Sequence, residues 1–222
     1  MAPKDPIVQT DAPVLRLVAK PLPTKDFGTM KLKSLIARMS RALAKEKFGV
    51  ALAAPQIGES LRIFVVAGRV LQESSDKDAE AEKEKEEKEH LPRPQDIVFI
   101  NPEIIRLSRK TKEMSEGCLS VRGKYGTVIR HEKATVRARD IDGKLFTYHA
   151  SGLMAHIFQH ECDHLDGILY TDKAEQLRND PEKSSSEDLG AGSEKSSNED
   201  LGAGPVKSGD HGGGRSETSD EE

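Results

Sequence analysis

Two segments of this 222-residue chain are too polar to enter a packed core, and they confine the fold to the remainder. Residues 73–94 contain neither an aromatic nor a β-branched residue, so burial there cannot offset the loss of conformational entropy. Further on, the segment KSSSEDLGAG from Lys183 is nearly repeated from Lys195, and each copy has too little apolar surface to stack as a repeat. We expect one domain over residues 1–179, with a disordered acidic insertion at 73–94 and a disordered acidic tail at 180–222.

Outside these two segments the chain carries more Lys and Arg than Asp and Glu, although its formal net charge is -4. A basic core is compatible with work near nucleic acid. No RNA-binding module or pattern of stacking aromatic residues is present, however, so no specific nucleic-acid partner is predicted. The N-terminus has no apolar run behind a basic start, and no stretch approaches the roughly 18 apolar residues of a membrane span. We therefore expect a cytoplasmic protein with no membrane partner.

The spacing of apolar residues predicts an α+β fold. Residues 31–47 place Leu32, Leu35, Ile36, Met39 and Leu43 on one side of an amphipathic helix. A second helix is expected from near Ser151, a plausible N-cap, through about Leu165. Between the two helices, β-rich runs occur at 61–67, 97–105, 117–121, 134–141 and 144–149, the last two joined by a turn at Asp142 and Gly143.

The second predicted helix contains the pattern HExxH, formed by His160, Glu161 and His164. Residues four apart lie on one face of a helix, so both imidazoles can reach one cation, and the glutamate stays close enough to take a proton from a water bound there. Two histidines on an amphipathic helix can equally be packing residues. His156, one turn earlier, would give three ligands nearly in a line, so we interpret it as lining the site rather than binding a metal.

A catalytic metal site of this kind needs a third protein ligand. A histidine six residues after His164 would complete one known pattern, but that position is Tyr170. Cys162 lies about 200° around the helix from the first histidine and faces away from it. Cys118, in the segment EGCLS, remains as a candidate, because a thiolate suits zinc or ferrous iron and persists in a reducing compartment. Taken alone, it is better read as a buried, inert cysteine.

Three motifs taken together make the chain resemble the peptide deformylase family. They are GVALAAPQ from Gly49 to Gln56, EGCLS from Glu116 to Ser120, and QHECDH from Gln159 to His164, and the resemblance covers about residues 7 to 175. Three motifs in this order are far more specific than any one of them. The resemblance implies an α+β fold with antiparallel sheets packed around a central HExxH helix and an amphipathic helix towards the N-terminus.

Carried over by position, the resemblance implies a set of site residues. The metal ligands would be Cys118, His160 and His164. The groups that act on the substrate would be Glu161 as general base, with the Gln56 amide and the Leu119 backbone N–H as donors to the developing oxyanion.

Further residues complete this expected site. Glu116 would steady a ligand histidine, with Arg130 as its ion partner. An apolar pocket for methionine is predicted, from position alone, at Val50, Leu153 and Ile157, and the substrate backbone is expected to pass Ala51. The family usually has glycine where this chain has Ala51, so the added methyl group is expected to narrow the groove, and many members have proline at the position of Arg122.

The activity implied by the resemblance is hydrolysis of the formyl group from the N-terminal formyl-methionine of newly synthesised polypeptides, with release of formate. One divalent metal ion is expected, Fe²⁺ first, with Zn²⁺ or Ni²⁺ as alternatives, since two imidazoles and a thiolate accept all three. The expected partners are formyl-methionyl nascent chains, with transient ribosome association as a further possibility.

Two other functions remain open at this point. HExxH alone would also suit a metal-dependent protease or amidase acting on another substrate, and cleavage of internal peptide bonds would reveal it. A catalytically inert metal-binding module would instead be closed by a fourth protein ligand, whereas the sequence offers three.

Overall fold

The computed structural model describes residues 5–70 and 95–179. The predicted insertion at 73–94 and the predicted tail at 180–222 lie outside these residues. No helix in the described ranges is long and apolar enough to cross a membrane.

The described residues form two antiparallel sheets and two α-helices, so the predicted α+β class is confirmed. One sheet has five strands in the order β1-β2-β3-β6-β7, and the other has three in the order β4-β5-β8. The first comprises β1 (Ala51–Ala53), β2 (Ile63–Val66), β3 (Ile97–Leu107), β6 (Lys133–Arg139) and β7 (Leu145–Ser151). The second comprises β4 (Thr111–Cys118), β5 (Val121–His131) and β8 (Glu175–Asn179).

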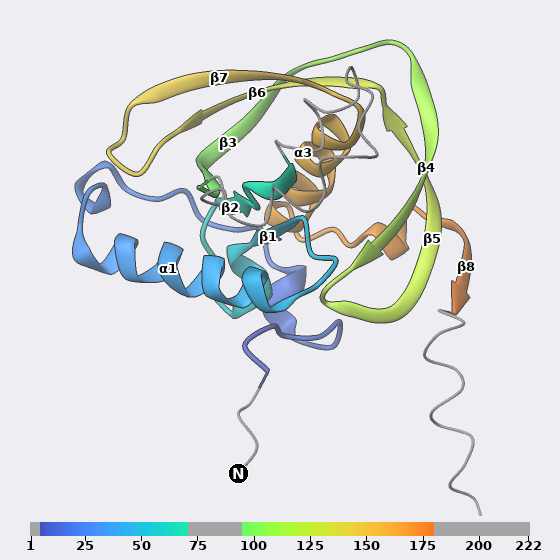
Figure 1. Ribbon diagram of the computed structural model, residues 1–222, viewed down its shortest axis with the longest axis horizontal. Helices are drawn as coiled ribbons and strands as arrows, with labels where there is room; N and C mark the ends of the chain where they lie inside the picture. The colour runs from blue at the N-terminus through green and yellow to red at the C-terminus, as the bar shows by residue number, and fades with distance from the viewer. Residues whose placement is uncertain (1–4, 71–94, 180–222) are drawn as a thin grey trace, which may run out of the picture. The chain divides into compact units, whose positions relative to one another are not determined.

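Helix α3 (Gly152–Leu165) carries the HExxH pattern and lies between the two sheets (Figure 1). Ser151 is its N-cap residue, as predicted, although its side chain makes no capping hydrogen bond. Phe158 on α3 packs edge-on against Phe99 of β3, with ring centroids 5.0 Å apart, and Phe99 in turn stacks on Phe64 of β2. These buried rings attach the helix to the five-stranded sheet and give its polar residues a fixed direction.

Helix α1 (Met30–Lys45) corresponds to the amphipathic helix expected at 31–47. Thr29 caps it by accepting a hydrogen bond from the backbone N–H of Leu32. Its apolar face is buried in the main core with β1 and β2, at Leu32, Leu35, Ile36, Met39 and Leu43. Short 3₁₀ helices complete the fold: η1 (Pro13–Arg16), η2 (Thr24–Asp26), η3 (Ala54–Ile57) and η6 (Tyr170–Asp172).

The strand predictions were only partly right. The run expected at 117–121 is the end of β4 and the turn into β5, because Cys118 pairs with Val121 across it. Strands β1 and β8 and most of β4 and β5 were not predicted. The remaining runs occur as β2, β3, β6 and β7, and the β6–β7 turn has Gly143 at φ 84°, a backbone conformation that suits glycine.

The chain leaves the five-stranded sheet and returns to it at neighbouring points on either side of residues 71–94. Val66, the last residue of β2, pairs with Ile97, the first residue of β3. Just beyond, the Gly68 backbone N–H donates to Asp96 Oδ1 at 3.1 Å. The two ends of the intervening segment are therefore held together by the sheet itself.

Candidate active site

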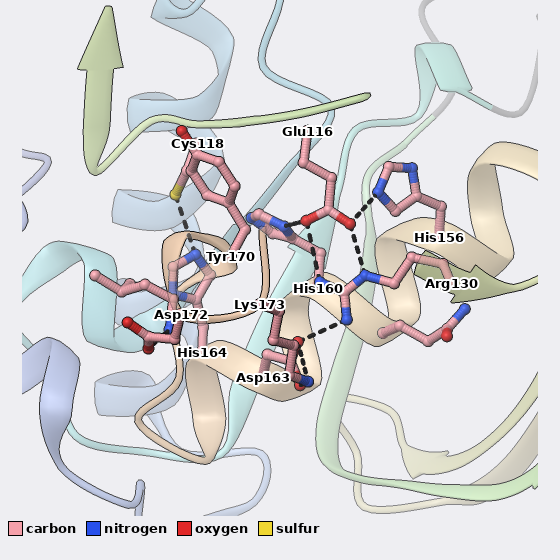
Figure 2. A network of polar contacts seen from close by, with 12 residues as sticks. Glu116, Cys118, Arg130, His156, His160, Asp163, His164, Tyr170, Asp172 and Lys173 are labelled. Atoms are coloured by element: carbon pink, nitrogen blue, oxygen red, sulfur yellow. Dashed lines mark hydrogen bonds and ion pairs between the residues drawn. The ribbon is translucent and has the colours of Figure 1, made fainter. Parts of the chain in front are cut away.

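Cys118, His160 and His164 meet at the junction of the two sheets. Their candidate ligand atoms all lie within 4.8 Å of one another. Cys118, the last residue of β4, places its Sγ 3.2 Å from His164 Nε2 (Figure 2). The two histidines come from successive turns of α3, with ring centroids 5.0 Å apart. The fold thus brings together three residues that are far apart in sequence and that suit one cation.

The charge balance of this cluster favours a thiolate. Burial alone would raise the pKa of Cys118, but His164 and His160 stabilise its anion and bring the pKa down to about 5. The other cysteine behaves differently, because burial raises the pKa of Cys162 to about 12 and the residue belongs to the main core. Cys162 therefore faces away from the site, as the helical spacing predicted.

Glu116 on β4 connects the cluster to Arg130 and His156 through its buried carboxylate. Its buried carboxylate accepts hydrogen bonds from His160 Nδ1 at 2.8 Å, from His156 Nε2 at 2.6 Å and from Arg130 Nε at 2.6 Å. Burial acts to raise the pKa of Glu116, but these hydrogen bonds outweigh it and hold the pKa well below its usual range. The bond from Nδ1 fixes the ring of His160 and leaves Nε2 for the cluster.

Arg130 on β5 is held from both sides. Besides its bidentate contact with Glu116, its Nη1 donates to Asp163 Oδ2 at 2.6 Å, and Lys173 also contacts Asp163 at 2.7 Å (Figure 2). The guanidinium lies almost fully buried between the two carboxylates. The chain Asp163–Arg130–Glu116–His160 therefore links α3, β5 and β4 through charged hydrogen bonds.

Glu161 is buried beside the cluster with an uncommitted oxygen. Its Oε2 has no hydrogen-bond partner within the described residues. Burial raises the pKa of Glu161 to about 7, although His160 and His164 oppose this shift. A buried carboxylate of this kind can both accept and return a proton near neutral pH.

Gln56, in η3, has an amide whose orientation is set by the backbone. Its Oε1 accepts the Ala53 N–H at 2.8 Å, so the amide nitrogen must point the other way. There, Nε2 donates to Ser120 Oγ at 3.2 Å and lies 3.4 Å from Cys118 Sγ. Gln56 therefore presents an N–H donor to the cluster, and Leu119, next to Cys118, lines the same cavity.

A cavity of about 980 Å³ opens onto the cluster. All four residues expected to contact substrate line it: Val50, Ala51, Leu153 and Ile157. Its walls include the edge strand β4 from Met114 to Cys118 and the start of the edge strand β1. An extended peptide could therefore lie along the free edge of β4 with its end at the cluster of Cys118, His160 and His164.

Several contributors were not assigned these roles from the sequence. Asp163 gave no signal beyond its place inside HExxH. The Tyr170 ring lies nearly parallel to the His160 ring with centroids 6.3 Å apart, and its hydroxyl donates to the Lys124 carbonyl. His156 is not part of the three-residue cluster, in line with its interpretation as a lining residue, and instead binds Glu116.

The residues present fit a catalytic metal better than a structural one. A thiolate and two imidazoles are borderline-soft donors that suit Zn²⁺, Fe²⁺ or Ni²⁺. In the described ranges the cluster has three members, which leaves one position of a tetrahedral site open. Glu161 lines the same cavity as Cys118 and His160, so it would lie beside an ion held by the cluster.

Comparison with known proteins agrees with this geometry. The family model described as "Polypeptide deformylase" matches residues 4–180. Peptide deformylases from Desulforudis audaxviator and Salinibacter ruber are 39% and 40% identical, over 77% and 68% of this chain and 94% and 72% of their own lengths. A crystal structure of the Acinetobacter baumannii peptide deformylase with Met-Ala-Ser bound is 29% identical with a TM-score of 0.62, covering 78% of this chain and 99% of that one. The chain belongs to the polypeptide deformylase family.

Proposed function

We propose that this chain is a metal-dependent peptide deformylase that releases formate from the N-formyl-methionyl end of newly made polypeptides. The observation that carries the proposal is the convergence of Cys118, His160 and His164 within 4.8 Å of one another, beside a cavity lined by Cys118, His160 and Glu161. We place the activity in the cytoplasm, because a thiolate ligand needs a reducing compartment. The proposal includes transient contact with the ribosome, since the substrates are newly made polypeptides.

The three clustered residues would hold one divalent ion, with Fe²⁺ as our first assignment and Zn²⁺ or Ni²⁺ as alternatives. When bound, such an ion polarises the formyl carbonyl and makes water acidic enough to lose a proton near neutral pH. Glu116 supports this role because its hydrogen bond to Nδ1 directs the other nitrogen of His160 towards the cluster.

Glu161 would move the proton. Its carboxylate takes a proton from the attacking water, whose oxygen bonds to the formyl carbon. As the C–N bond breaks, Glu161 gives that proton to the departing amine, so formate and a free N-terminus result. A pKa of about 7 supports both halves of this cycle, because neither transfer is then strongly uphill at neutral pH.

Gln56 and Leu119 would stabilise the charge that builds on the formyl oxygen. The Ala53 N–H keeps the Gln56 amide nitrogen directed at the site, so no reorganisation is needed when charge appears. The Leu119 backbone N–H would be the second donor, and each such donor is typically worth about 3 kcal/mol.

The cavity suits a peptide with an apolar first residue. Val50, Leu153 and Ile157 would receive the methionine side chain, while the peptide backbone pairs with the free edge of β4. The Acinetobacter baumannii relative supports a peptide ligand that begins with methionine, since it was crystallised with Met-Ala-Ser bound.

The deciding experiment measures formate release from formyl-Met-Ala-Ser, using protein purified without oxygen and loaded with Fe²⁺ or Ni²⁺. We expect turnover by the native chain and a loss of at least about 100-fold in Glu161→Ala with metal content retained. Glu113→Ala, an exposed glutamate on β4 outside the cavity, is the matched control and should keep full activity.

Three outcomes would contradict the proposal. Unchanged turnover in Glu161→Ala would remove the mechanism. Cleavage of internal peptide bonds without any need for a formyl group would favour a metal-dependent amidase or protease. No release from folded, fully metallated protein would favour a metal-binding module.

A further inference from the structure

The solvent face of α1 carries a row of four cations, with Lys33 as a further exposed cation outside the row. Lys31, Arg38, Arg41 and Lys45 are all exposed, and their spacings of about seven, three and four residues place them along one stripe of the helix. Ser34 occupies the remaining position of the stripe. At 1.5 Å per residue, the row extends over about 21 Å. Helix α1 contains no acidic residue at all.

This arrangement works against the stability of the helix. Lys31 lies in the first turn, where acidic residues are favoured and none is present. Arg41 has cations both three residues before and four residues after it, and like charges at these spacings repel. Within the part of the chain that the structure describes, only Arg38 of the row has an ion partner, Glu59 at 3.0 Å. Helix stability therefore does not account for the row.

The row ends at the mouth of the active-site cavity. Glu46, Lys47 and Phe48 follow α1 directly and line that cavity. Arg122, in the β5 wall of the cavity, is tied to Glu46 at 2.8 Å. Figure 1 shows the C-terminal end of α1 approaching β1, whereas its N-terminal end lies far from α3. A ligand lying along α1 would thus reach the entrance through which substrate passes.

We propose that the α1 row of Lys31, Arg38, Arg41 and Lys45 binds the phosphate backbone of RNA. A straight row of about 21 Å can contact several successive phosphates of one strand. A membrane surface fits less well, because the large apolar residues of α1 from Leu32 to Leu43 are buried in the core and leave Met30 as the one large apolar side chain of the helix that could insert between lipids. Resting on the proposed function, this contact would hold the cavity mouth near the RNA surface where nascent chains emerge.

The test measures binding of the full chain to a labelled RNA hairpin over a range of salt concentrations. The variant K31Q/R41Q/K45Q should weaken binding about tenfold or more at low salt and reduce the slope of log Kd against log salt by about 2. The matched control, R106Q/K112Q/K133Q, removes one Arg and two Lys from β3, β4 and β6 and should change the Kd less than about twofold. Glutamine keeps a high helix propensity, so α1 should remain folded.

The outcomes separate this inference from the proposed function. Equal weakening of RNA binding by both variants would overturn the inference, because net charge alone would then attract RNA. No RNA binding by the native chain, or binding only to anionic lipid vesicles, would also overturn it. Formate release from a short formyl peptide should be the same in all three proteins, because none of the substituted residues lines the catalytic cavity. If the native chain binds RNA through α1 but releases no formate, the proposed function is overturned and the RNA-binding inference stands.

Discussion

Helix α3 is attached to its two neighbouring sheets by opposite kinds of interaction. On the side of the five-stranded sheet, Phe158 packs among aromatic rings, with Phe99 at 5.0 Å and Tyr148 at 5.5 Å between centroids. On the side of the three-stranded sheet, Asp163 and His160 join Arg130 and Glu116 through charged hydrogen bonds of 2.6 to 2.8 Å. One contact is apolar, whereas the other is polar and includes two neutral hydrogen bonds between Gln159 and the His131 backbone at the end of β5.

The difference reflects what each contact must specify. Apolar packing stabilises the helix but tolerates small shifts, because dispersion has no preferred direction. Hydrogen bonds between charged groups are directional, and they connect the strand that supplies Cys118 to the helix that supplies both histidines. We infer that the aromatic contact of α3 contributes more to stability than the ionic contact does, whereas the ionic contact sets the relative positions of Cys118, His160 and His164.

Truncation of the aromatic side should produce the largest loss of stability. Phe158→Ala removes a fully buried ring and should lower the free energy of unfolding by about 3–5 kcal/mol. Urea titration of the metal-loaded protein measures this loss, and Phe158→Leu should lose clearly less. At urea concentrations where Phe158→Ala stays folded, its metal affinity should be close to the native value. A large drop in affinity would contradict the inference that the aromatic contact serves stability and the ionic contact serves metal binding.

Breaking the ionic side should affect both stability and metal binding. Arg130→Met leaves the buried Glu116 without its arginine and Asp163 with Lys173 alone, at a cost of about 3 kcal/mol. Because Glu116 would then no longer be held against His160, metal affinity should fall about 10- to 100-fold. Competition with a coloured chelator measures the affinity. Arg130→Lys restores the charge without the planar fork, and it should recover stability better than affinity.

An ion pair farther from the metal cluster should matter least. Arg122 contacts Glu46 at 2.8 Å and Asp5 at 3.0 Å, and its side chain is about one-third exposed. Solvent screens such pairs, so Arg122→Gln should lower the free energy of unfolding by less than about 1 kcal/mol. Metal affinity in this variant should match the native value, and a change comparable to that of Arg130→Met would show that ionic contacts act at longer range than we infer.

The helices were the most predictable part of the fold. Helix α1 buries one face in the core, so its apolar residues recur at helical spacing. Helix α3 is buried on most sides, and its start was marked by Ser151 at the N-cap. Strands β4 and β8 have mostly exposed residues and owe their conformation to pairing with β5, which leaves no alternating pattern in their own sequences. The segment 117–121 shows the opposite error, because apolar residues that line a cavity beside a turn resemble a short strand.

The site was predictable in proportion to how local its signals are. His160, Glu161 and His164 lie within five consecutive residues of one helix, so their spacing alone suggested a metal. Cys118 was only a candidate until the resemblance to a family assigned it as a ligand, since nothing in its own segment shows that the fold places it 3.2 Å from His164. Asp163 was missed because its partner Arg130 lies on β5, and no sequence pattern connects the two.

The pairing of Val66 with Ile97 has a consequence for how this protein could be engineered. Since the sheet holds Val66 and Ile97 side by side, any chain inserted between β2 and β3 begins and ends at neighbouring points. The length of chain between β2 and β3 can therefore change during evolution without separating these two strands. The same position is a natural point of insertion for a reporter domain, fused within the chain instead of at either terminus.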